Sequence, residues 1–229
     1  MKTSLLIVTM LCSTWCAYGQ GTVLFANRIV NVISAPVWGP CTDPTIKLTG
    51  NFIPSDLHFP PDPSRYEVCG GVKIGGLHYS AQLWGASTGA PLDSLQPAGG
   101  TNGSSIITAT FRTGSAAGLL ITTTVQFNNL APGESASLVM RVWDNRDGAI
   151  TSWAQVLADP TVLRGESEVF DLPILGGIRG DGTAVETPAM RGLKSFNLYI
   201  VPEPATLGLV LLGMAALALR RAVSSLSSR

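Results

Sequence analysis

Apolar and polar residues alternate along several short stretches of the chain, which is the pattern of half-buried β-strands. Between residues 77 and 84 every second side chain is apolar, beginning with Leu77, and residues 136–143 repeat the pattern from Ala136. Stretches rich in Gly, Asn and Pro separate these segments and favour turns. Strands are predicted on this basis at residues 22–27, 77–84, 106–112, 119–127, 136–143, 166–172 and 193–201.

The near-regular spacing of these strands predicts the fold class. No long stretch with helical periodicity lies between them, although residues 149–158 fit either a strand or a short helix that Pro160 ends. Residues 35–65 hold seven prolines, which we expect to exclude central strands there. We therefore predict an all-β protein, with one antiparallel β-sandwich or jelly-roll-like domain over residues 20–200.

The first residues have the pattern of a secretory signal peptide. Lys2 supplies a positive charge, residues 5–11 are apolar, and Ala17 and Gly19 are small residues at the usual spacing before a cleavage point. We predict a signal peptide over residues 1–19. The exported domain then begins in an oxidising compartment.

The C-terminal stretch combines prolines, an apolar run and basic residues. Val-Pro-Glu-Pro at residues 201–204 precedes residues 205–219, which carry no charge, and Arg220 and Arg221 follow at once. Such a run, although shorter than about 20 residues, favours a transmembrane helix with its basic end in the cytoplasm. The alternative is a core helix of a soluble domain, which would show a polar stripe at helical spacing, and this run has none.

This order of features resembles the PEP-CTERM sorting signal, with Pro202, Glu203 and Pro204 at the positions of the family's Pro-Glu-Pro motif. In that family a membrane protease-transpeptidase called exosortase recognises the motif and tail, in Gram-negative bacteria that make extracellular polysaccharide. The resemblance covers about the last 28 residues. A start of the form Gly-Thr-Val-Leu-Phe-Ala-Asn, found here at residues 21–27, is also similar to many proteins that carry this signal.

The resemblance implies a sorting signal over residues 201–229 and exosortase as the processing partner. It implies export through the inner membrane, with transient anchoring there before processing. Afterwards the protein would lie at the cell surface or in the extracellular matrix, where extracellular polysaccharide is a further partner to consider.

Two cysteines remain once the signal peptide is removed, Cys41 and Cys69. An even pair in an oxidising compartment predicts a disulfide, which on the chain-entropy model would stabilise the fold by about 3 kcal/mol. The alternative is two separate buried thiols. A metal site is not indicated, because the chain has no Cys-x-x-Cys spacing and His58 and His78 stand apart. We expect no cofactor.

The charge of the exported part excludes one class of partner. Removing Lys2, Arg220, Arg221 and Arg229 from the 15 basic residues leaves 11 against 15 acidic residues, a net charge of −4. Binding to nucleic acid or to an anionic membrane surface would need a basic patch, and no run of Lys or Arg occurs in this region.

Two clusters are candidates for ligand binding. Asp144, Asn145 and Asp147 could offer oxygen ligands to calcium, but they lack EF-hand spacing and are also ordinary hairpin-turn residues. The second cluster comprises aromatic side chains that could stack on sugar rings, with core or rim packing as the alternative. Its members are Tyr79, Trp84, Trp143 and Trp153.

No catalytic motif is present in the sequence. Glycoside hydrolysis would need a defined pair of carboxylates, and a serine hydrolase would need a Gly-x-Ser-x-Gly turn near a strand end. We therefore expect no enzymatic activity. The leading hypothesis is a non-enzymatic exported protein of the envelope or extracellular matrix. The second is a carbohydrate-binding β-sandwich, and the third, least favoured, is a secreted glycan hydrolase or lyase.

Overall fold

Short strands dominate the computed structural model, which describes residues 19–50, 65–101 and 106–201 of the 229-residue chain. Two short helices, α1 (Arg65–Val68) and α2 (Trp153–Ala158), and two 3-10 turns, at Leu92–Ser94 and Gly114–Ala116, accompany them. The strands are β1 (Gly21–Phe25), β2 (Arg28–Ile29), β3 (Ile33–Ser34), β4 (Val37–Trp38), β5 (Gly76–Ser87), β6 (Gln96–Pro97), β7 (Gly99–Gly100), β8 (Ala109–Phe111), β9 (Thr123–Phe127), β10 (Ala136–Asp144), β11 (Arg164–Glu166), β12 (Phe170–Leu172), β13 (Gly177–Ile178), β14 (Ala184–Val185) and β15 (Phe196–Asn197). The described part is therefore all-β, in agreement with the sequence.

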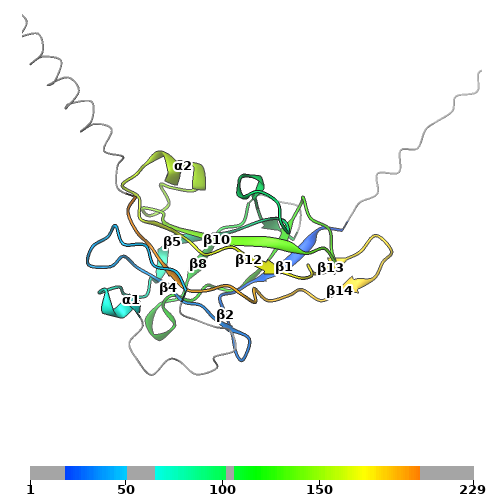
Figure 1. The fold of residues 1–229 in the computed structure, drawn as a ribbon, viewed down its shortest axis with the longest axis horizontal. Coiled ribbons are helices and arrows are strands. Elements are labelled where there is room, and N and C mark those ends of the chain that lie inside the picture. The colour runs from blue at the N-terminus through cyan, green and yellow to red at the C-terminus, as the bar shows by residue number, and fades with distance from the viewer. Residues whose placement is uncertain (1–18, 51–64, 102–105, 202–229) are drawn as a thin grey trace, which may run out of the picture.

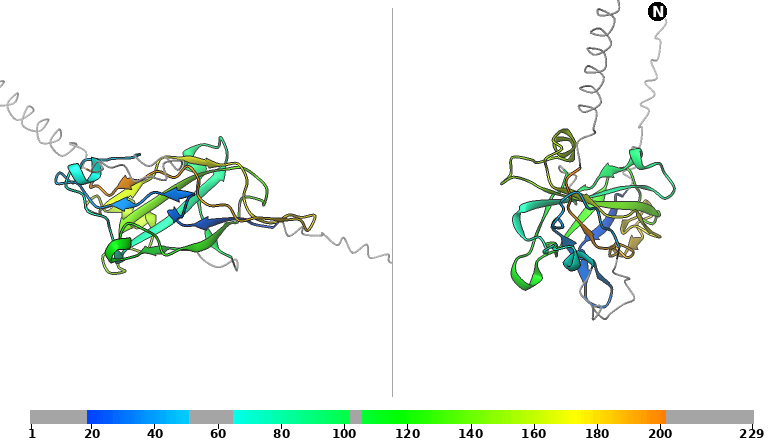
Figure 2. Two further views of the ribbon diagram at one scale, coloured as in Figure 1. Left: turned by 90° about the horizontal axis from the view of Figure 1, so that it is seen from below. Right: turned by 60° about the vertical axis from the view of Figure 1, so that its left-hand side comes forward.

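The two longest strands, β5 and β10, form the centre of the larger sheet. They pair antiparallel from Ser87 and Ala136 at one end to Tyr79 and Asp144 at the other. Strands β11 and β12 extend this sheet beside β10, and β6 and β8 extend it beside β5. Figures 1 and 2 show both long strands running along the length of the domain.

The main hydrophobic core lies between this sheet and a second one, in which β9 pairs with β1 and β7. Phe25 of β1 and Phe127 of β9 belong to one buried cluster with Leu83 of β5 and Leu138 of β10. Gly85 of β5 leaves room for this packing, because a Cβ there would lie 2.7 Å from side-chain atoms of Phe127 in the second sheet and of its own cross-strand partner Leu138. Two antiparallel sheets thus share one core. Their assignment to a sandwich or jelly roll remains a prediction.

Strand β10 is buried on both faces, which explains its many apolar residues. On the face away from the main core, Trp143 packs with Trp153 and Val156 of α2. Figure 1 shows α2 on the side of β10 opposite to β2 and β4. The helix begins at a capping box, in which the Ser152 side chain accepts from the Gln155 amide and the Gln155 side chain accepts in return. The sequence left strand and helix open here, and the structure shows a helix.

Several predicted segments differ from the structure. Of residues 106–112 and 119–127, only β8 and β9 are strands. Residues 166–172 form not one strand but parts of two, β11 and β12, which pair with β10 on either side of an interruption at residues 167–169. Of residues 193–201, only β15 is a strand, and it pairs parallel with β4. The prolines around residue 38 do not exclude an interior strand, because Trp38 pairs with Asn197 and also with Lys73 on its other side.

The signal peptide, the apolar run at residues 205–219 and the motif Pro202–Glu203–Pro204 lie outside the described residues, apart from Gly19 at the predicted cleavage point. Within the described ranges, no helix has the length and apolar character needed to cross a membrane.

Candidate functional site

The segment that leads to the Pro-Glu-Pro motif is held by backbone hydrogen bonds almost to its end. The amide of Leu198 donates to the carbonyl of Trp38 at 2.9 Å, and Tyr199 exchanges both backbone bonds with Arg164, at 2.8 and 3.0 Å. The amide of Ile200 donates to the carbonyl of Pro44 at 2.7 Å. The fold therefore holds the chain to within two residues of Pro202. We call residues 196–201 the exit segment.

Asn197 connects the exit segment to the loop at residues 43–48. Its side chain is buried, and its Nδ2 donates to the carbonyl of Ile46 at 2.9 Å while its Oδ1 accepts from the amide of Leu48 at 2.7 Å. Sequence analysis missed this residue, because a polar residue between Phe196 and Leu198 in an alternating pattern predicts a solvent-facing position. The paired polar groups account for its burial.

The predicted disulfide between Cys41 and Cys69 is confirmed, with the two Cα atoms 5.0 Å apart. It joins the chain just before the same loop to the residue that follows α1, and the amide of Thr42 donates to the carbonyl of Cys69 at 2.8 Å beside it. Cys41 is buried, and its Sγ lies 3.7 Å from Nδ2 of Asn197. The disulfide thus supports the loop against which the exit segment packs.

A charged group holds the other side of this region. Glu168 accepts from Nζ of Lys194 at 2.8 Å and from the hydroxyl of Thr49 at 3.0 Å. These two hydrogen bonds, with Lys194 the larger cause, lower the pKa of Glu168 below its ordinary value. The carboxylate therefore stabilises the fold in its charged form.

Tyr66 of α1 anchors the same region from inside. Its hydroxyl lies 2.7 Å from the carbonyls of both Gly50 and Ser195, and its ring stacks on Trp38 with the centroids 5.4 Å apart. Burial raises the pKa of Tyr66 well above its ordinary value, so the hydroxyl stays a neutral donor.

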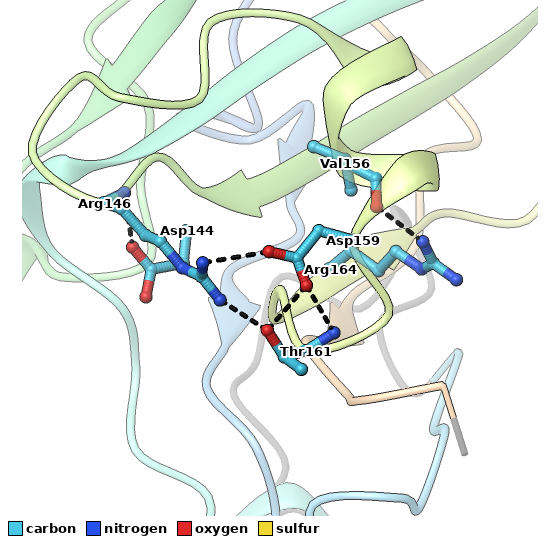
Figure 3. A network of polar contacts seen from close by, with 6 residues as sticks. All are labelled: Asp144, Arg146, Val156, Asp159, Thr161 and Arg164. Atoms are coloured by element: carbon cyan, nitrogen blue, oxygen red, sulfur yellow. Dashed lines mark hydrogen bonds and ion pairs between the residues drawn. The ribbon is translucent and has the colours of Figure 1, made fainter. Parts of the chain in front are cut away.

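A polar network surrounds the turn after β10 (Figure 3). The Arg146 guanidinium donates to Oδ2 of Asp159 at 2.9 Å and to the hydroxyl of Thr161 at 2.6 Å, and the Arg146 amide donates to Oδ1 of Asp144 at 2.9 Å. Hydrogen bonds from the Thr161 hydroxyl and amide lower the pKa of Asp159. Arg164 donates to the carbonyl of Val156 at 2.8 Å, which ties the last turn of α2 to the strand beside the exit segment.

An open pocket of about 440 Å³ lies at the same turn. Its lining is mixed in charge, and the His78 side chain pairs with Asp147 across it. The lining residues are His78, Tyr79, Asp144, Arg146 and Asp147.

The predicted calcium ligands do not converge in this turn. The buried side chain of Asn145 points inward, where Nδ2 donates to the carbonyl of Leu77 at 2.7 Å and to the hydroxyl of Ser80 at 3.0 Å. Asp144 accepts from a backbone amide, and Asp147 pairs with His78. In the described part of the chain, no group of three or more His, Cys, Asp or Glu side chains is placed to hold a metal ion.

The predicted aromatic platform is also wrong for most of its members. Trp143 and Trp153 are 0% and 4% exposed and pack on each other with their ring centroids 6.0 Å apart. Tyr79 packs against the main core instead. Trp84 is half-buried, as Tyr79 is, and the Arg141 guanidinium covers the Trp84 ring at 4.3 Å from the centroid. These rings do not form one surface for a sugar.

Arg141 is the second residue that sequence analysis missed. Its guanidinium also lies 5.1 Å from the Trp153 ring centroid, and Nε donates to Glu166 at 3.0 Å. Arg141 lies near Trp84 because of the strand pairing. Arg141 of β10 is opposite Gln82 of β5, and Trp84, two residues further along β5, lies on the same face of the sheet. A cation between two aromatic rings stabilises packing.

Residues 201–222 match the family model of the PEP-CTERM protein-sorting motif. This match confirms the resemblance seen in the sequence, and it includes Pro202, Glu203 and Pro204. No curated protein and no solved structure is detectably similar to the chain. The motif is a substrate signal for exosortase processing, so the chain is an exported protein whose precursor is anchored in the membrane before processing.

Proposed function

We propose that this protein is a non-enzymatic component of the cell envelope or extracellular matrix, which exosortase sorts through Pro202, Glu203 and Pro204. The observation that carries the proposal is the position of the motif. It begins two residues after Ile200, the last residue of the exit segment with a hydrogen bond to the domain. The domain and its sorting signal are therefore directly joined, and processing near the motif would release or transfer the whole domain.

The architecture supports a structural role for the domain. Two antiparallel sheets share one core, which favours the β-sandwich that we propose for the fold. The Cys41–Cys69 disulfide suits an exported protein. His78 and Asp147 form an exposed pair, but the nearby Ser80 hydroxyl is buried and accepts from Asn145 instead. This arrangement lacks the hydroxyl nucleophile that a hydrolytic triad would use.

Fractionation of the host tests the sorting part of the proposal. The protein with intact tail is expected in the medium or at the cell surface. A variant with Pro202, Glu203 and Pro204 all changed to Ala is expected to stay in the inner membrane. A matched control changes three serines that follow the basic residues of the tail to Ala, and it is expected to sort normally. These are Ser224, Ser225 and Ser227. Equal release of the Pro-Glu-Pro variant would contradict the proposal.

Incubation of the secreted protein with a panel of polysaccharides, including the host's own, tests the non-enzymatic part. We expect no release of reducing ends and no unsaturated products. Turnover of any polymer in the panel would overturn this part of the proposal. Retention on the host polymer without turnover would instead favour the second hypothesis, a carbohydrate-binding module.

A further inference from the structure

The membrane-anchored precursor places one face of the domain close to the lipid. This inference rests on the proposed function, because it requires the apolar run at residues 205–219 to be inserted before processing. Four residues separate Ile200, which the fold holds, from Ala205, where the run begins. Even fully extended, the five steps from Ile200 to Ala205 span no more than about 18 Å. The headgroup layer alone is roughly 5–7 Å thick on each side of the hydrocarbon core.

Residues around the exit segment define this face. The loop at 43–48 presents Ile46, which is 40% exposed, and α2 presents Leu157, which is 59% exposed. The Ile200–Pro44 and Asn197–Ile46 hydrogen bonds hold the loop beside the exit segment. Arg164 holds Val156, the neighbour of Leu157, to the same strand that pairs with Tyr199. We call this the exit face.

The chemistry of the exit face matches a membrane interface. Tyr199 is partly exposed, and Nζ of Lys47 lies 5.4 Å from its ring centroid. Tyrosine and lysine beside exposed aliphatic side chains are typical of the headgroup level, where rings lie between polar and apolar surroundings and long cations reach the polar side. The same loop also carries Asp43, so its charges balance, and contact would depend on apolar burial more than on anionic lipid.

We propose that, in the precursor, the exit face rests on the lipid interface of the inner membrane, with Ile46 and Leu157 in contact with lipid. The opposite end of the domain, which carries the β13–β14 hairpin, points away from the membrane. Figure 1 shows this hairpin at the right-hand end of the domain and α2 in its left half. Ile178 of β13 is 63% exposed and serves as a matched aliphatic control at the distant end.

The test uses the full chain from Gln20 to Arg229 in vesicles of phosphatidylethanolamine and phosphatidylglycerol. Three single variants, Ile46→Cys, Leu157→Cys and Ile178→Cys, carry an environment-sensitive fluorophore, and flotation measures anchoring separately. Because all three positions are exposed, the fold should tolerate the label, which a urea unfolding curve of each labelled protein checks. Slower hydrogen exchange at the amides of Ile46 and Leu157 in the unlabelled vesicle-bound protein gives a second measurement.

We expect floating vesicles in which the labels at positions 46 and 157 shift to shorter wavelength and are quenched by nitroxide headgroup lipids, at low and high salt alike. The label at position 178 should do neither. Floating vesicles in which all three labels stay in water would overturn this inference and leave anchoring intact. A signal that arises only after exosortase is added would overturn it in favour of a protein contact. Failure to float would overturn both the inference and the proposed sorting route.

Discussion

Buried polar side chains in the exit segment stabilise the fold through hydrogen bonds that the sequence pattern does not predict. Asn197→Ala removes two hydrogen bonds and leaves the Ile46 carbonyl and the Leu48 amide without their side-chain partners. We expect a loss of about 3 kcal/mol in the free energy of unfolding, measured in urea. The control Asn128→Ala, at an exposed position in the turn after β9, should cost less than about 0.5 kcal/mol. Equal losses would contradict the role of Asn197.

Arg141 tests whether a cation between two tryptophans stabilises the outer face of the larger sheet. Its side chain is mostly buried, contacts Trp84 and Trp153, and pairs with Glu166. Arg141→Ala leaves that carboxylate without its partner, so we expect a loss of about 2–3 kcal/mol in urea unfolding. Arg146→Ala removes an exposed ion pair, and its effect should be much smaller. A larger effect of Arg146→Ala would contradict this assignment.

Glu168 makes the stability depend on acidic pH. Its folded pKa lies below the ordinary value of 4.5, so the carboxylate's stabilisation is fully present above that value and is lost as pH falls through the folded pKa. The wild-type protein should therefore lose stability below about pH 4.5, and Glu168→Gln should lose less over the same range. Urea unfolding at several pH values measures this. Glu186→Gln, at an exposed position, should keep the wild-type profile, and an identical profile for Glu168→Gln would exclude the effect.

At the scale of elements, the disulfide and the exit segment form one unit. Cys41→Ser combined with Cys69→Ser should lower the free energy of unfolding by about 3 kcal/mol, as measured in urea. Hydrogen exchange should also accelerate more at the amides of Leu48 and Ile200 than at the centre of β10. The disulfide supports the loop at residues 43–48, which contains Leu48 and accepts the hydrogen bond of Ile200. Wild-type protein treated with reductant is the control and should behave alike. Uniform acceleration across the domain would contradict this local coupling.

Periodicity predicted the long elements well and the short ones poorly. Strands β5 and β10 have their predicted faces, because Ala81 and Leu83 share the main core with Leu138 and Met140. Alternation is a local signal, so it identified the strands in which every second side chain packs into the core. It could not show that residues 167–169 interrupt the strand after Glu166, since the pairing with β10 determines that break.

The candidate site was predictable only where covalent chemistry or a motif marks it. The even count of remaining cysteines and the predicted oxidising compartment sufficed for Cys41 and Cys69, and the order of features sufficed for the Pro-Glu-Pro signal. Aromatic residues carry no signal for exposure, so the sequence left both a sugar-binding surface and core packing open for Trp143 and Trp153. The structure buries Trp143 of β10 against Trp153 of α2. The burial of Asn197 depends on a loop about 150 residues away in sequence, which no local pattern encodes.

At the scale of the whole molecule, the domain lies between the predicted signal peptide and the matched sorting motif. Its described ends, near Gly19 and Val201, lie toward opposite ends of the long axis (Figure 1). The C-terminal end combines the exit segment, the disulfide-supported loop and α2. Anchoring through the tail would therefore hold the domain with its C-terminal end near the membrane. Processing beside the exit segment would release the whole domain.

Mass spectrometry of the C-terminal peptide, on protein recovered from cells and from medium, shows whether exosortase removes the tail. We expect the mature form to end at or near Pro202–Pro204, and forms carrying residues 205–229 to occur in the membrane fraction only as precursor. Recovery of the protein only with residues 205–229 attached, in the membrane fraction, would rule out this processing. The protein would then be a tail-anchored periplasmic protein, and sorting to the surface or matrix would lose its support.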